Sequence, residues 1–173
     1  IGTQTWMQEN LRVTHYNDGM PIEYYDGTGV GLDRPHYSWY NNDTNNKIPY
    51  GGLYSWTAVN TGKLCPIGWR IPTKYDYSQL VEYLGGGSVA GGKMKMTGTD
   101  YWNSAYGNYG ANNSSGFSAV GGGFHAVYDV FRVFKEYGYY WTSSLDTNSY
   151  NQVRPVANLI NAVNANTNLF PND

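Results

Sequence analysis

The chain has 173 residues, a net charge of −2 and a single cysteine, and its length is typical of one domain. The low, balanced charge leaves no basic patch, which argues against a nucleic-acid partner. No apolar run approaches the ~20 residues that a membrane-spanning helix needs, and one cysteine excludes an internal disulfide. The 18 tyrosines and 6 tryptophans predict a small core built largely from aromatic side chains.

The first part of the chain predicts little regular structure. Residues 1–14 predict a strand that runs into a turn, and the stretch that follows, rich in Asn, Asp, Gly and Tyr, predicts mainly loop. Leu53, Trp56 and Val59 then recur at helical spacing, so we expect a short helix there.

The clearest helix begins at Thr73. Thr73 and Asp76 match a capping box in which Asp replaces the usual Glu or Gln. One apolar face follows at helical spacing, formed by Tyr77, Leu80, Val81 and Leu84. Glycines at 85–87 predict the end of this helix, and residues 88–115 are predicted as loop.

The last third of the chain predicts strands. Short β-like runs are separated by the glycines at 121–123 and by Gly138, and they contain Phe117, Ala119, Phe131, Val133, Tyr139 and Trp141. Val153, Val156 and Leu159 predict one more strand. We therefore expect a single α+β domain over residues 1–173, with two short helices, a small twisted antiparallel sheet and long irregular loops.

No pattern in the sequence indicates catalysis. His15, His36 and His125 lie in unrelated segments without the spacing of a zinc site. Cys65 lacks the neighbouring base that a nucleophilic cysteine needs, so we interpret it as structural. The sequence therefore predicts a protein that is not an enzyme.

One loop offers oxygen ligands for calcium. Asn41, Asp43 and Asn45 lie close together, but calcium favours six to eight oxygens and usually several carboxylates. The plain alternative is a solvated turn. We predict no cofactor and no metal site, with this loop as the one weak candidate for calcium.

Several segments together resemble a known family, the Fibrobacter succinogenes major paralogous domain. This is a C-type-lectin-like module found in surface lipoproteins and secreted proteins of Bacteroidetes and Fibrobacteres. The matching segments are IGTQTWMQENL (1–11), YGGLYSW (50–56), LCPIGWRIPT (64–73), AGGKMK (90–95), NNSSGFSAVGGG (112–123) and GYYWTSS (138–144).

The resemblance implies a C-type-lectin-like fold and no catalytic residues. It also implies scaffold roles, as core or loop anchors, for Trp6, Trp56, Trp69, Trp102 and Trp141. Members usually end in a strand similar to GFSVRC, whose cysteine would pair with Cys65. This sequence stops at Asp173 before such a strand, so we expect that the final strand is lacking or that Cys65 is unpaired.

Two further features bear on the ligand. The EPN, QPD and WND motifs of calcium-dependent sugar-binding lectins are absent. The chain is nevertheless rich in Tyr, Asn, Ser and Gly, which provide contact area and adaptable hydrogen bonds in antibody paratopes. The residues that we expect to contact the ligand are Tyr106, Asn108, Tyr109, Asn148, Tyr150, Asn151, Arg154, Asn158 and Asn161.

The sequence thus predicts a non-enzymatic, adhesin-like binding domain, secreted or on the bacterial outer membrane. Its ligand would be a glycan or a protein surface. One alternative is a self-assembling structural subunit of a surface filament or cell envelope, built through an open sheet edge. Another is a variable binding protein diversified by a retroelement, because residues 158–173 consist almost wholly of Asn and the products of mutated Asn codons.

Overall fold

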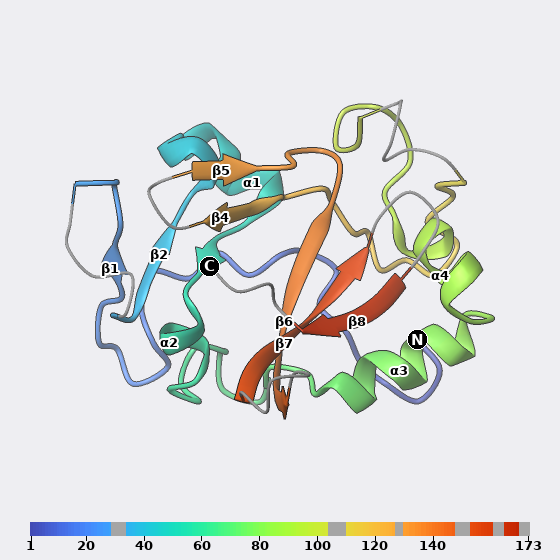
Figure 1. The fold of residues 1–173 in the computed structure, drawn as a ribbon, viewed down its shortest axis with the longest axis horizontal. Coiled ribbons are helices and arrows are strands. Elements are labelled where there is room, and N and C mark those ends of the chain that lie inside the picture. Colours follow the sequence, from blue (N-terminus) through green and yellow to red (C-terminus); the bar gives the residue numbers. More distant parts are fainter. Residues whose placement is uncertain (29–33, 104–109, 127–129, 148–152, 161–164, 170–173) are drawn as a thin grey trace.

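Three small sheets and four short α-helices make up the described part of the chain (Figure 1). The computed structural model describes residues 1–28, 34–103, 110–126, 130–147, 153–160 and 165–169. The strands are β1 (Glu23–Tyr24), β2 (His36–Ser38), β3 (Leu53–Tyr54), β4 (Phe124–Ala126), β5 (Val130–Arg132), β6 (Gly138–Thr147), β7 (Val153–Ile160) and β8 (Ala165–Leu169). The helices are α1 (Lys47–Tyr50), α2 (Trp56–Val59), α3 (Lys74–Tyr83) and α4 (Gly87–Met94), and two 3-10 turns cover Tyr40–Asn42 and Thr44–Asn46.

The sheets confirm the mixed α and β class. In the first sheet β2 pairs with β1 in parallel and with β3 in antiparallel orientation. β4 and β5 form an antiparallel pair, and the largest sheet is antiparallel with the order β6-β7-β8. The registers place Gly138 opposite Ile160 and Ile160 opposite Ala165, with an irregularity in β6 between Trp141 and Leu145.

Two expectations about strands are settled by these sheets. The strand expected around Val153–Leu159 is confirmed as β7. The strand expected within residues 1–14 is wrong, because no strand lies there. Side-chain amides fix this segment instead: Asn10 donates to the carbonyl oxygen of Tyr50 at 2.8 Å, and Gln4 donates to that of Asp76 at 3.1 Å.

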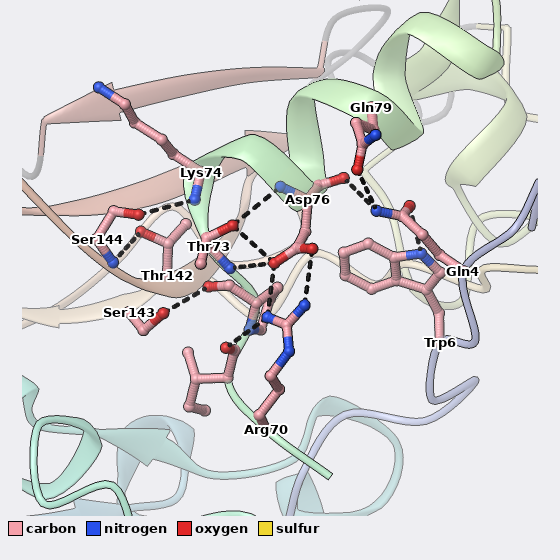
Figure 2. Close-up of polar contacts among 12 residues, drawn as sticks. Gln4, Trp6, Arg70, Thr73, Lys74, Asp76, Gln79, Thr142, Ser143 and Ser144 are labelled. Atoms are coloured by element: carbon pink, nitrogen blue, oxygen red, sulfur yellow. Dashed lines mark hydrogen bonds and ion pairs between the residues drawn. The ribbon is translucent and has the colours of Figure 1, made fainter.

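The start of α3 has the predicted capping box (Figure 2). Thr73 Oγ1 accepts from the Asp76 N–H at 3.1 Å, and the Asp76 carboxylate accepts from the Thr73 N–H at 2.6 Å. Both N–H groups lie at the helix start, where no carbonyl of the helix itself can accept them. The same carboxylate accepts two N–H groups from Arg70, at 2.6 and 2.8 Å. One carboxylate therefore joins the helix to the turn that precedes it.

The end of α3 is formed by the predicted glycines. Gly85 N–H donates to the Glu82 carbonyl and Gly86 N–H to the Val81 carbonyl, which is the pattern of a Schellman motif. Gly85 has φ +99°, in the left-handed region that favours glycine. α3 contacts all three strands of the large sheet, and α4 contacts β8.

The loop expected over residues 88–115 is wrong at its beginning, because Gly87–Met94 form α4. Glycine is a poor helix former, so the sequence favours loop. Tertiary contacts overcome that preference, since Gly92 lies so close to the chain that a Cβ would be 2.5 Å from the Gly110 carbonyl oxygen. Carbonyls at the end of α4 are also satisfied, because Asn112 N–H donates to Gly92 and Ser115 N–H to Lys93.

The buried side chains form two separate hydrophobic clusters. The first packs under α3 and α4, and its buried members are Tyr77, Leu80, Leu84, Ala90, Met94, Trp102, Phe117 and Ala119. The second lies beside β2 and α2, and its buried members are Ile22, Tyr37, Trp39, Val59 and Leu64. Among the described residues, no helix is both long and apolar enough to cross a bilayer.

We expect Asp76→Asn to lower the free energy of unfolding by about 1–3 kcal/mol at neutral pH, since it weakens the cap and the bonds to a charged acceptor. Hydrogen bonds from Arg70 and Thr73 hold the pKa of Asp76 well below its usual range. Its stabilisation is therefore complete above the unfolded-state pKa near 4 and declines as the pH falls further. Urea unfolding across this range measures both effects.

The control is Glu9→Gln, because Glu9 forms an exposed ion pair with Arg12 and should change stability by less than ~0.5 kcal/mol. Equal losses in the two variants would contradict the role assigned to Asp76.

Lys95 provides a second test of the fold. It follows α4, is fully buried, and its Nζ lies 5.4 Å from the centroid of the Trp102 ring. Burial lowers the pKa of Lys95 to about 8. The unfolded chain keeps this proton up to about pH 10. Between about pH 8 and 10 the folded state therefore binds fewer protons than the unfolded chain, so the free energy of unfolding should rise with pH.

We expect Lys95→Met to reduce this rise between about pH 8 and 9.5, and Lys93→Met to retain it. Thermal unfolding at a series of pH values measures the slopes. Identical slopes in wild type and Lys95→Met would show that Lys95 titrates as an ordinary surface lysine.

Candidate functional site

A cleft of about 990 Å³ lies where the two hydrophobic clusters meet. Trp6, Tyr77, Phe117 and Tyr140 border it from the first cluster, and Trp56, Leu64, Ile71 and Trp141 border it from the second. Its volume is in the range of cavities that hold small molecules or short chains. Most of the lining comes from five stretches of sequence, 3–11, 50–56, 64–72, 117–126 and 138–141, and His36, Val59, Asp76 and Tyr77 add to it.

Aromatic side chains on one wall are fixed by their polar atoms. Trp141 Nε1 donates to the Tyr54 carbonyl at 2.7 Å, and the Trp141 and Trp56 rings lie 5.4 Å apart. The Tyr54 hydroxyl donates to the Val13 carbonyl at 2.8 Å. These bonds join β6, β3 and the N-terminal segment, so this wall is formed before any ligand arrives.

The turn before α3 contributes an aromatic ring and a cation side by side. Trp69 is 41% exposed and lines the cleft. Arg70 follows it, and its guanidinium is held by two hydrogen bonds to Asp76 (Figure 2). Trp6 and Gln4 of the N-terminal segment also line the cleft. Trp6 Nε1 donates to Gln4 Oε1 at 3.1 Å, and Gln4 Nε2 donates to the Asp76 carbonyl at 3.1 Å.

The β4 side of the cleft adds further rings. Phe124 and Tyr139 meet edge to face at 5.1 Å, and His125 stacks on Phe131 at 4.0 Å. The His125 Nδ1 atom lies 3.1 Å from Ser38 Oγ. Ser38 is fully buried and is not among the residues that line the cleft, so we interpret this pair as a link between β2 and β4.

Cys65 lines the cleft as a buried thiol. Burial raises the pKa of this thiol, which disfavours the reactive thiolate. Asn17 donates to the Cys65 carbonyl at 3.1 Å and fixes the backbone there. This environment gives Cys65 none of the activation that nucleophilic catalysis requires.

The other scaffold tryptophans lie at different depths. Trp102 is fully buried, and its Nε1 donates to the Ala119 carbonyl at 2.9 Å. Trp6, Trp56 and Trp141 are half-buried beside the cleft.

Most of the expected ligand contacts fall outside the described residues. These are Tyr106, Asn108, Tyr109, Asn148, Tyr150, Asn151 and Asn161. Arg154 and Asn158 lie on β7, with Arg154 opposite Asp146 and Asn158 opposite Tyr140. Whether any of them contacts a ligand stays a prediction.

The loop considered for calcium forms a capped turn. Asp43 Oδ1 accepts from the Asn45 N–H at 2.9 Å, while Asn41 has φ +56° within the preceding 3-10 turn. No group of three or more His, Cys, Asp or Glu side chains suited to a metal ion occurs in the described ranges.

The cleft and the fold define a small mixed α and β domain with one wide, aromatic-lined cleft. The chain belongs to the Fibrobacter succinogenes major domain family, whose sequence model matches residues 1–169. Comparisons with curated proteins and with solved structures gave no match. The C-type-lectin-like fold that the resemblance implies therefore stays a prediction.

The segments that carry the family resemblance converge on this cleft. Five of the six, at 1–11, 50–56, 64–73, 112–123 and 138–144, contribute lining residues. The sequence alone predicts scaffold roles for these motifs and places the ligand contacts in the Asn-rich loops. One signal within the motifs does point to the cleft: polar side chains stand next to aromatic ones, as with Gln4 near Trp6 and Arg70 beside Trp69.

We expect Cys65 to react with 5,5′-dithiobis(2-nitrobenzoic acid) at least ~10 times more slowly in the folded protein than in the urea-unfolded chain, since it is buried and its pKa is raised. Absorbance measured at pH 7 and 8 reports the rate. Equal rates in the folded and unfolded protein would show that Cys65 is open to solvent.

Proposed function

We propose that this domain is a non-enzymatic, adhesin-like binding module that acts in a secreted or cell-surface protein. It holds a glycan or a protein segment in the cleft between the two hydrophobic clusters. The supporting observation is the cleft itself, about 990 Å³ in volume and walled by tryptophan and tyrosine rings. The location rests on the family resemblance, whose members occur in surface and secreted proteins.

The chemistry of the lining supports binding rather than catalysis. Tyr and Trp rings provide rigid contact area at a small loss of rotamer entropy, and the exposed amide of Gln8 offers both donors and an acceptor. Asp76 is committed to the cap and to Arg70, and the Cys65 thiol has a raised pKa. The lining therefore presents an aromatic surface with neutral polar groups.

The proposal needs no bound cation. Among the residues that the structure describes, the carboxylates that line the cleft are those of Glu9 and Asp76, and each already pairs with an arginine. Calcium prefers several carboxylate ligands in one site. We therefore expect ligand binding to persist when calcium is removed with a chelator.

The test is a screen of the purified domain on a glycan array and a peptide array, with and without calcium, followed by variants of each candidate face. We expect Trp69→Ala to weaken binding of a hit by about tenfold, since a stacked or buried ring is a frequent hot spot. Tyr83→Ala, which removes an exposed aromatic outside the cleft, should leave binding unchanged.

Tyr150→Ala and Asn151→Ala decide between the cleft and the loops expected from the sequence. Loss of binding in these two variants, with full binding in Trp69→Ala, would move the site away from the cleft and contradict the proposal.

A further inference from the structure

Charge is scarce in the cleft, and this feature narrows the class of ligand. Of the described residues that line it, the only Asp, Glu, Lys or Arg side chains are those of Glu9, Arg70 and Asp76. Arg70 and Asp76 neutralise each other at 2.6 Å, and Glu9 pairs with Arg12 at the same distance. A ligand in this cleft therefore meets little net charge across a wide, polar and aromatic surface.

Arg70 is preorganised but already neutralised. Its guanidinium makes two parallel hydrogen bonds to Asp76, and that carboxylate also accepts from both the backbone N–H and the hydroxyl of Thr73. An anionic ligand group would have to compete with this fixed carboxylate for the guanidinium. The side chain remains 67% exposed, and a guanidinium carries five N–H donors, of which the bonds to Asp76 use two and a 3.4 Å bond to the Ile71 carbonyl uses a third. It can therefore still donate to neutral oxygen acceptors.

Trp69 completes the arrangement. It is the neighbour of Arg70 in sequence, lines the same cleft and is 41% exposed, whereas Trp6, Trp56 and Trp141 in the lining are half-buried. A pyranose ring has an apolar face of C–H groups and a rim of hydroxyls that donate and accept hydrogen bonds. A flat exposed indole next to a fixed, neutralised guanidinium and the exposed amide of Gln8 matches both features.

We infer that the cleft binds an uncharged oligosaccharide, with one sugar ring stacked on Trp69 and its hydroxyls hydrogen-bonded to Arg70. This inference rests on the proposed function and specifies the ligand class for the same cleft. Acidic saccharides are disfavoured, because Asp76 and Glu9 would face their carboxylates. Affinity for the uncharged ligand should change little with salt, since no ion pair forms on binding.

The test uses three probe sets on the intact chain: cellohexaose and mannohexaose as neutral oligosaccharides, hexagalacturonate as an acidic one, and a random peptide array. Tryptophan fluorescence and calorimetry measure binding at low and high salt. We expect a neutral hexasaccharide to bind with nearly the same affinity at both salt concentrations. Trp69→Ala should weaken it by about tenfold, and Trp69→Phe by less, because phenylalanine keeps a stacking ring.

Tyr75→Ala is the matched control, because Tyr75 is an exposed aromatic at the start of α3 that does not line the cleft. Its affinity should equal that of the wild type. Thermal unfolding of Trp69→Ala checks that the domain remains folded, and Trp69→Phe gives an independent readout if it does not.

Each other outcome overturns the inference in a distinguishable way. Tighter, salt-sensitive binding of hexagalacturonate would show that the cleft prefers acidic glycans. Peptide hits lost in Trp69→Ala, with no saccharide hit, would refute the glycan class while leaving the proposed binding function in place. No hit in any of the three sets would refute the inference and the proposed function together.

Discussion

The Asp76 carboxylate is the contact on which the arrangement of this domain depends. It closes the capping box at the start of α3 and holds the Arg70 guanidinium of the turn that comes before the helix. That turn must leave the second hydrophobic cluster at Leu64 and Ile71 and deliver Tyr77 to the first. One side chain thus links the turn that leaves the second cluster to the helix that packs on the first, and residues of both the turn and the helix line the cleft.

Because the buried side chains form two small clusters, aromatic rings at the margins of both clusters are left only half-buried. Each cluster is completed by half-buried aromatics, and several of them line the cleft: Trp6, Tyr54, Trp56, Tyr140 and Trp141. Trp141 shows how the space is kept open, since its Nε1 is bonded to Tyr54 and its ring packs on Trp56. Aromatic side chains anchored by their polar atoms form a rigid wall, which lowers the entropic cost of binding a ligand there.

The sequence predicts those parts of the fold that depend on residues close to one another along the chain. Thr73, Asp76 and the glycines after Leu84 determine where α3 begins and ends, and each of them bonds to a residue only a few positions away in the sequence. α4 is not predicted from the sequence, because its stability comes from distant contacts, such as the close approach of Gly92 to Gly110. The cleft is not predicted for the same reason, since Trp6, Trp69 and Trp141 line a common space only in the folded chain. The sequence shows which residues are suited to binding, but not which of them face a common space.

The six tryptophans allow a direct measurement of whether a ligand enters the cleft and contacts Trp69. Each indole N–H gives a separate signal in a nitrogen–proton NMR spectrum, and each can be assigned by single Trp→Phe changes. On titration with an oligosaccharide or peptide that binds, we expect shifts for Trp69 and for the other tryptophans of the lining, Trp6, Trp56 and Trp141, while the signal of the buried Trp102 stays unchanged. Saturable binding that leaves the Trp69 signal where it was would show that the ligand binds outside the cleft.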